Sequence, residues 1–330
     1  MSHNLSQTDG KPSMFYTGEV PWHGLGKKLE NAATAAEAIA AAGLDWKVNK
    51  EAIFLKDGSK IDRQYATVRS DTKKALGVVG EVYRPLQNKE AFSFFDAVVG
   101  SKEAIYTTAG ALGDGERVWL LAKLPGHIRV IGDDIAEKYL LLTNTHNGTT
   151  TADILFTPVR VVCQNTLNIA LSDATRKQKI RHTRSMGLKV ADVRAGLGII
   201  QERFAQFEVQ AQALVKVNFK QADLDTYFKA IGLLPQKDNE IAAMSTRAKN
   251  IIEEVTKMFE HGKGNDLPGV KGTAWGAFNA VAEYVDYTRS VRGGDNSQER
   301  QESRTTSLLF GSGALLKQKA WDAAMDLVAK

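Results

Sequence analysis

The residue pattern of this 330-residue chain changes character at Pro158. Before this proline, short apolar runs alternate with turn-forming sequences such as Asp57-Gly58-Ser59, which is typical of strands joined by hairpins. After it, the regular stretches repeat their apolar residues at helical spacing. Because strands and helices are segregated along the chain, the sequence predicts an α+β fold and argues against an alternating βαβ arrangement.

The first half is predicted to hold an antiparallel or mixed sheet with one or two helices, and the second half to be all-helical. Apolar or alanine-rich runs that stop at Gly43 and Gly100 predict the two helices of the first half, because glycine often follows a helix C-terminus. Expected strands lie at 51–55, 61–69, 75–80, 104–112, 117–124, 127–132, 138–146 and 151–158, with hairpin turns at 57–59 and 70–74. Expected helices of the second half lie at 190–215, 221–232, 240–260, 274–291 and 304–330.

These patterns divide the chain into four parts. They are a flexible N-terminus at 1–18, a β-rich α+β core domain at 19–173, a basic loop at 174–189 and a helical region at 190–330. A flexible linker is expected inside the helical region at 292–303, where glycine and polar residues replace the apolar repeat.

Positive charge is concentrated in one segment. Residues 1–165 hold 19 Lys+Arg against 19 Asp+Glu, whereas residues 166–330 hold 24 against 19, so the second half carries the whole formal charge of +5. Residues 174–191 contain no acid, and their cations are Arg176, Lys177, Lys179, Arg181, Arg184 and Lys189. A run of one sign repels itself unless an anion compensates it. The segment is therefore either a solvated surface or a site for something negative.

Several kinds of chemistry lack support in the sequence. A single cysteine excludes an internal disulfide framework and fits a reducing cytoplasm. No signal-peptide core and no apolar run of membrane-spanning length are present, so we expect a cytoplasmic protein that makes no membrane contact. The Gly-Lys pairs at 26–27 and 262–263 lack the context of a phosphate loop, and the six histidines lie singly. We expect no cofactor and no metal.

The segment around Cys163 is interpreted as structural. Proline suits the first position of a helix, so Pro158 predicts a helix over 159–171 that packs on the β-rich half and delivers the basic loop. Cys163 lies in its apolar run, and free cysteines usually behave as small buried hydrophobes. A nucleophilic role would need a base, which His146 or His182 could supply only through the fold.

Polar residues after a predicted strand offer a second candidate site. Asn144, His146 and Asn147 belong to a cluster that Asx-turn and threonine-turn chemistry can explain. The functional interpretation is a polar pocket in which these residues face the segment after Pro158. Its members would be Asn144, His146, Asn147, Cys163, Gln164 and Asn165.

Aromatic residues beside cations offer a third candidate. Tyr287 precedes Arg289 and Arg292 near a glycine pair, an arrangement in which a single nucleic-acid strand could be gripped. Together with the basic segment and its neighbours, the candidate nucleic-acid-binding residues are Arg160, Arg176, Lys177, Lys179, Arg181, His182, Arg184, Lys189, Tyr287, Arg289 and Arg292.

Four strings in the sequence resemble a known family. They are PWHGLG at 21–26, YRPLQNKEAF at 83–92, THNGTTTADILFTPVRVVCQNTLNIAL at 145–171 and TAWGAFNAVAEYVDY at 273–287. In this order they are similar to the phage/plasmid-related protein family, whose domain bears only the label domain of unknown function 932. The resemblance implies that the gene lies on a mobile element, near genes for DNA replication and recombination. The family usually has His-Asp-Gly-Ser where this chain has His146-Asn147-Gly148-Thr149, so no acid–base or metal role is carried over to that position.

The function predicted from the sequence is ATP-independent binding of single-stranded DNA. The chain would act in recombination or replication of a phage or plasmid, as a single-strand annealing protein comparable in role to the RecT and lambda-beta recombinases. Expected partners are single-stranded DNA, further copies of the chain in a ring or filament, and host or phage recombination proteins. Two alternatives stay open: an enzyme with a polar pocket around His146, Arg160, Cys163 and Asn165, and an anti-defence protein that binds a host factor.

Overall fold

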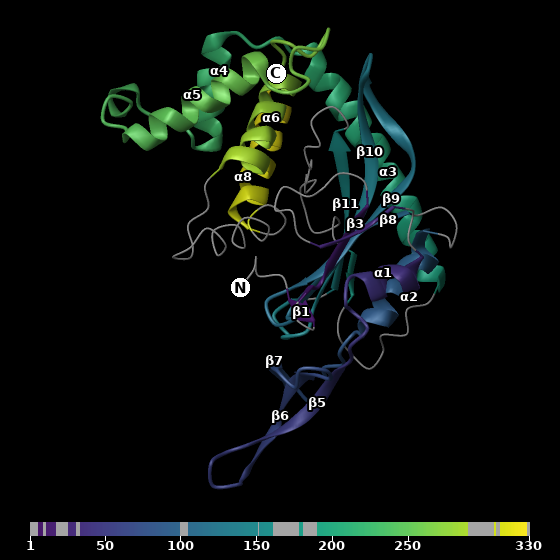
Figure 1. The fold of residues 1–330 in the computed structure, drawn as a ribbon. Helices are drawn as coiled ribbons and strands as arrows, with labels where there is room; N and C mark the ends of the chain where they lie inside the picture. The colour runs from purple at the N-terminus through teal and green to yellow at the C-terminus, as the bar shows by residue number, and fades with distance from the viewer. Residues whose placement is uncertain are drawn as a thin grey trace.

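A computed structural model describes residues 6–8, 11–17, 26–30, 34–99, 105–150, 152–160, 178–180, 190–289, 307 and 311–328. Strands fill the first half and helices fill the second half, as the sequence predicts for an α+β fold. Figure 1 shows the strands and helices as two regions that meet where α3 runs beside the large sheet.

The large sheet has seven strands in the order β12-β11-β10-β9-β8-β3-β4. All neighbours are antiparallel except β3 and β4, which are parallel. The strands are β3 (Met14–Thr17), β4 (Lys27–Leu29), β8 (Ile105–Leu112), β9 (Arg117–Ile131), β10 (Asp134–Thr145), β11 (Ala152–Arg160) and β12 (Gln178–Ile180). A short pair, β1 (Gln7–Thr8) and β2 (Lys11–Pro12), precedes them.

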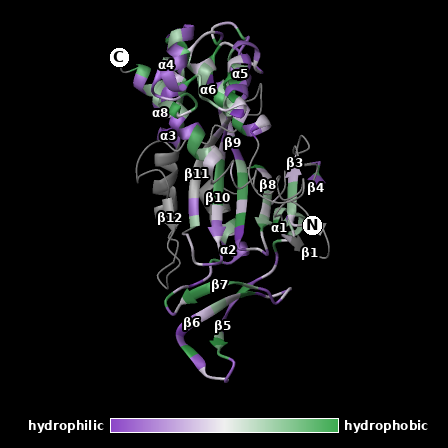
Figure 2. Ribbon diagram, turned by 90° about the vertical axis from the view of Figure 1, so that its left-hand side faces the viewer, coloured by the Kyte–Doolittle hydropathy of each residue, from purple (hydrophilic) through white to green (hydrophobic). Residues whose placement is uncertain are grey.

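Successive side chains of a strand point to opposite faces of the sheet, and Figure 2 shows hydrophobic residues in green along the central strands. Leu120 and Leu140 lie in the main core, whereas their neighbours Trp119 and Leu141 belong to a smaller cluster on the opposite side with Met14. The helices α1 (Ala35–Ala41), α2 (Asn88–Val99) and α3 (Val190–Lys216) contact strands of the sheet. The main core includes residues of these helices together with those of the sheet and the helical half.

A second sheet projects from the body of the molecule as an arm (Figure 1). It is an antiparallel meander of β5 (Val48–Phe54), β6 (Lys60–Arg69) and β7 (Ala75–Gly80). Both predicted hairpins are present, and Gly58 at the first turn has φ of 83°, a conformation that glycine adopts without steric cost.

The helical half packs around aromatic side chains. Trp321 of α8 stacks on Phe207 of α3 with ring centroids 5.2 Å apart, and its edge meets Phe278 of α6 at the same distance. The elements are α4 (Gln221–Ile231), a 3-10 turn η1 (Asp238–Glu240), α5 (Thr246–His261), α6 (Ala274–Glu283), a π-helical turn η2 (Tyr284–Thr288) and α8 (Ser312–Val328). Within the described ranges, no helix is long and apolar enough to cross a membrane.

The structure corrects the sequence prediction at Pro158. This residue lies inside β11, where it pairs with Lys138 of β10, so the helix expected from residue 159 is wrong for Val159 and Arg160. The physical reason is the position of the proline: among the described residues, β12 pairs with residues 152–154 of β11 and none pairs with Pro158 on that side, where a strand tolerates proline. The rest of the expected helix, 161–171, lies outside the described residues.

Three further boundaries differ from prediction. Met14–Thr17, expected in a flexible N-terminus, form strand β3 inside the large sheet. Gln178–Ile180 of the expected basic loop form edge strand β12. The helix expected from residue 240 begins at Thr246, because the Ser245 hydroxyl accepts a hydrogen bond from the Ala248 N–H and caps it there. The expected linker at 292–303 lies outside the described residues.

Candidate nucleic-acid interface

The candidate interface is built where α5 ends and α6 begins. The Gly262 N–H donates to the Met258 carbonyl at 2.7 Å and closes α5. A Cβ atom on Gly262 would lie 2.3 Å from that carbonyl oxygen, so this position requires glycine. The buried Asn265 amide donates to the carbonyl oxygens of Met258 and Gly276, each at 2.9 Å. These bonds fix the loop that carries Lys263 against α6.

A π-helical turn continues α6 and holds the aromatic residues of the interface. Tyr284 and Asp286 in this turn are buried, whereas the side chain of Tyr287 is 40% exposed. The Asp286 carboxylate accepts a hydrogen bond of 2.8 Å from the Lys317 ammonium of α8, and this ion pair is buried. π-helical turns are rare and are often found at functional sites. The pair ties the turn to α8 and thereby fixes where Tyr287 emerges.

One cation lies beside the exposed tyrosine, and a second follows it two residues later in the chain. The Lys263 ammonium lies 5.4 Å from the centroid of the Tyr287 ring, within the range of a cation–π contact. The half-buried Arg289 is held by its backbone N–H, which donates to the Tyr284 carbonyl at 2.8 Å. Its Nη1 atom is buried and has no hydrogen-bond partner among the residues that the structure describes. An anion could accept a hydrogen bond from this guanidinium.

The charges around Tyr284 are of both signs. Burial raises the pKa of the Tyr284 phenol, while the positive charges of Arg289 and Arg247 act in the opposite direction. Glu254 adds to the upward shift. The Glu283 carboxylate also lies at this corner, where it accepts a hydrogen bond of 3.1 Å from the Lys263 backbone N–H.

These side chains can bind both parts of a nucleotide. An exposed aromatic ring stacks on an unpaired base, and adjacent cations neutralise phosphates. We call Tyr287, Lys263 and Arg289 the helical-corner site. The sequence indicates Tyr287 and Arg289 as members of a site but not Lys263, because Lys263 lies 24 positions before Tyr287 in the chain.

The structure describes two other predicted nucleic-acid-binding residues, each through its backbone. Lys179 lies in β12, at the edge of the large sheet, and pairs with Asp153. Arg160 ends β11 opposite Ala136 of β10. The remaining predicted residues lie outside the described residues: Arg176, Lys177, Arg181, His182, Arg184, Lys189 and Arg292.

Two residues of the predicted polar pocket, Asn144 and His146, lie in a buried structural cluster, whereas Asn147 is half-buried. Asn144 and His146 are fully buried. The Asn144 amide donates to the Leu86 carbonyl at 3.0 Å, and His146 Nε2 lies 3.0 Å from Asn88 Oδ1. Asn147 forms an Asx turn, because its Oδ1 accepts from the Thr149 N–H at 3.1 Å. Cys163, Gln164 and Asn165 lie outside the described residues.

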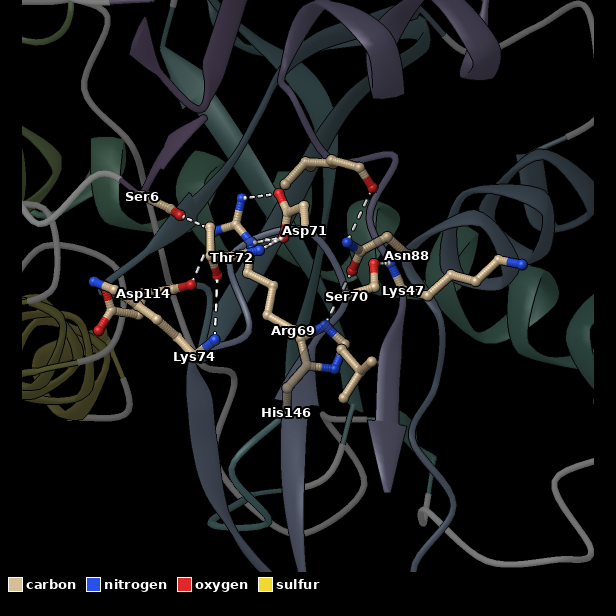
Figure 3. A network of polar contacts seen from close by, with 12 residues as sticks. Ser6, Lys47, Arg69, Ser70, Asp71, Thr72, Lys74, Asn88, Asp114 and His146 are labelled. Atoms are coloured by element: carbon tan, nitrogen blue, oxygen red, sulfur yellow. Dashed lines mark hydrogen bonds and ion pairs between the residues drawn. The ribbon is translucent and has the colours of Figure 1, made fainter. Parts of the chain in front are cut away.

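The same cluster anchors the arm, as Figure 3 shows. Arg69, the last residue of β6, is buried, forms an ion pair of 2.8 Å with Asp71, and donates to Ser6 Oγ and to the Asp114 carbonyl. Its guanidinium carbon lies 4.4 Å from the centroid of the Trp46 ring, whose edge meets the His146 ring at a centroid distance of 5.4 Å. His146 therefore belongs to the packing that joins the arm to the large sheet.

The cavity near the root of the arm does not include the described residues of the predicted polar pocket. A surface cavity of about 430 Å³ lies near the root of the arm, and neither Asn144 nor His146 lines it; its walls are Asp45, Trp46, Lys47, Gln87, Lys89, Glu90 and Ser93. Over the described ranges, no three His, Cys, Asp or Glu side chains gather in a way that could hold a metal ion.

Comparison with protein families gives one match. Residues 75–309 match the domain of unknown function 932 (DUF932). This span begins at β7 and includes Asn144 and His146, the basic segment at 174–191 and the helical-corner site. Comparison with curated proteins and with solved structures gives no significant match. Because the matched span covers most of the chain, the protein belongs to the DUF932 family.

Proposed function

We propose that the chain binds single-stranded DNA without ATP and promotes annealing of complementary strands. In this proposal it serves replication or recombination of a phage or plasmid, in a role comparable to that of the RecT and lambda-beta recombinases. It would work as a ring or filament of several copies, alongside host or phage recombination proteins.

The observation that carries the proposal is the helical-corner site. Tyr287 is exposed beside the Lys263 ammonium, and Arg289 follows it two residues later in the chain. A base can stack on the tyrosine ring while a phosphate oxygen accepts from the cations. Stacking of this kind favours a single strand, because the bases of a duplex already stack on one another.

The acid-free segment at 174–191 supports the same proposal through its charge. Its six lysines and arginines would replace counterions condensed along a strand, and release of those ions favours binding. Residues 178–180 of this segment form an edge strand of the large sheet, which gives at least part of it a fixed place on the fold.

Fluorescence anisotropy with labelled oligothymidine and with a duplex tests this proposal. The intact protein should bind the single strand more tightly than the duplex, with an affinity that falls as salt rises. Tyr287→Ala should weaken single-strand binding by about tenfold, within the range that loss of one stacked base produces, whereas Tyr287→Phe should keep most of the affinity.

Lysine variants provide the matched comparison. Lys263→Ala removes the cation over Tyr287, whereas Lys257→Ala removes an exposed lysine of α5 that pairs with Glu253 at 2.9 Å. We expect the first variant to weaken binding and the second to leave it nearly unchanged. Equal affinity for single strand and duplex, or full affinity in folded Tyr287→Ala, would contradict the proposal.

A further inference from the structure

The end of the arm presents two exposed apolar side chains. Residues 54–60 are all exposed, and they form the turn between β5 and β6. The side chains of Phe54 and Leu55 are 61% and 54% exposed. Figure 1 shows this turn at the far end of the arm, away from the helical half. Two large apolar side chains are unfavourable in water unless another molecule covers them.

The turn itself is well ordered by hydrogen bonds. The Leu55 N–H donates to the Ser59 carbonyl at 2.8 Å, and the Gly58 N–H donates to the Leu55 carbonyl at 3.0 Å. Asp57 Oδ1 accepts from the backbone N–H and the hydroxyl of Ser59, at 2.9 and 2.6 Å. The Asp57 carboxylate thus stabilises the turn, and the conformation that presents Phe54 and Leu55 is fixed locally.

Cations lie on both sides of the two apolar residues. Lys56, Lys60 and Arg63 are exposed near the turn, against the acids Asp57 and Asp62. A register shift between Ala52 and Phe54 marks a β-bulge, and Arg63 has φ of 58°, a left-handed conformation that is uncommon for residues other than glycine. Bulges change the direction in which side chains point, so the end of the hairpin is shaped differently from a regular ladder.

The other end of the arm is held firmly. Arg69 and Trp46 anchor β6 in the buried cluster, and the Lys50 ammonium binds the carbonyl oxygens of Gly80, Glu81 and Tyr83 at 2.7–3.2 Å. Because these contacts hold the root of the hairpin, its end can keep a fixed position when it contacts a partner.

We infer that the turn of the β5–β6 hairpin is a second contact for single-stranded DNA. Phe54 and Leu55 lie against unpaired bases, and Lys56, Lys60 and Arg63 lie near phosphates. The inference rests on the proposed function and adds a region outside the matched family span, which begins at residue 75. A protein partner fits less well, because a stable interface buries about 800 Å² on each side and the turn offers two large apolar side chains flanked by cations.

Photo-crosslinking tests the inference directly. The photoreactive amino acid p-benzoylphenylalanine replaces Phe54 in the full chain, and irradiation follows with and without oligothymidine. We expect a covalent adduct between residue 54 and the oligonucleotide. The same amino acid at Val209, an equally exposed position on α3, is the control and should give little adduct. A crosslink from residue 54 to a second copy of the chain, with none to DNA, would overturn the inference in favour of self-assembly.

Binding measurements provide the second test. Phe54→Ala with Leu55→Ala should weaken oligothymidine binding by about tenfold, which corresponds to about 1.4 kcal/mol. Leu315→Ala, which removes an exposed leucine of α8, should not weaken it. If the arm variant binds as well as the intact protein while Tyr287→Ala loses affinity, the arm inference is wrong and the proposed function stands. If the intact protein does not bind oligothymidine, both are wrong.

Discussion

The indole Nε1–H of Trp275 donates a hydrogen bond of 2.7 Å to Oδ2 of Asp134. Both residues are fully buried. Asp134 is the first residue of β10 and Trp275 is the second residue of α6, so the bond joins the sheet to the helical half across 141 positions of sequence. The two halves therefore share a buried polar contact as well as an apolar core.

Removal of the indole donor should destabilise the protein. Trp275→Phe leaves the Asp134 carboxylate without this hydrogen bond in the interior, and we expect a decrease of about 1–3 kcal/mol in the free energy of unfolding. Urea denaturation followed by circular dichroism measures it. In a double-mutant cycle with Asp134→Ala, the two decreases should be less than additive. Additive decreases would show that the bond contributes nothing to stability.

The buried Lys317–Asp286 pair predicts a different pattern. Lys317→Met or Asp286→Leu alone leaves one uncompensated charge in the interior and should cost about 3–5 kcal/mol. The double substitution removes both charges, so its free energy of unfolding should lie close to that of the intact protein. Denaturation of the three variants checks this. A double variant as unstable as the single variants would show that the pair stabilises the π-helical turn in its own right.

Two glycines of β7 provide a matched test of how the arm is seated. A Cβ atom at Gly77 would lie 2.6 Å from the Cα atom of Asn147, whereas one at Gly80 would meet nothing within 4 Å. Gly77→Ala should therefore push the arm away from the 145–150 turn and cost about 1–3 kcal/mol. Gly80→Ala should change stability by less than about 0.5 kcal/mol. Similar thermal midpoints for the two variants would contradict the close approach.

The Arg69–Asp71 pair should make arm stability depend on pH. Burial alone would raise the pKa of the Asp71 carboxyl, but hydrogen bonds from Arg69 and the Thr72 N–H, with the Arg69 charge, hold that pKa below its usual 3.8. A carboxyl whose pKa is lower in the folded state stabilises the fold above its unfolded pKa, and this contribution disappears as pH falls through the folded pKa. Stability should thus fall as the pH drops from about 4, more steeply in the intact protein than in Asp71→Asn. Thermal denaturation over this range measures the difference, with Asp62→Asn as an exposed control from the same arm.

The basic segment should contribute to DNA binding through charge alone. Replacing Arg176, Lys177, Arg181 and Arg184 by Ala should weaken binding. It should also reduce the slope of log affinity against log salt, by about 0.7 for each phosphate of a single strand that the variant no longer neutralises. Salt titrations of both proteins measure this slope. An unchanged slope in a folded variant would show that this segment does not contact the DNA phosphates. Trypsin cleavage in the segment should also slow when oligothymidine is bound.

Prediction from sequence worked where the information is local. The Asp57-Gly58-Ser59 turn follows from residues that are close in the chain. It failed where the deciding contact is distant. Pro158 is typical of a helix start, and only its position beyond the β12 pairing explains how a strand accepts it.

The candidate site shows the same limit. Lys263 lies beside Tyr287 because α5 and α6 pack together, and nothing in the residues around Lys263 indicates that neighbour. A polar residue after a strand, such as His146, can line a pocket or can be buried as part of the packing, and the local sequence does not distinguish the two. The contacts of His146 with Asn88 and Trp46, both far away in sequence, indicate packing.

The pairing of β3 with β8 has a consequence for synthesis on the ribosome. Phe15 pairs with Ala109, so β3 has no partner in the large sheet on that side until residues near 109 have emerged. At translation rates of about 5–20 residues per second, this interval lasts roughly 5–20 s. During that time, Phe15, which is fully buried in the finished fold, must be shielded by other means. The nascent chain should therefore engage chaperones that bind apolar segments early, and a permuted chain in which β3 follows β8 should need them less.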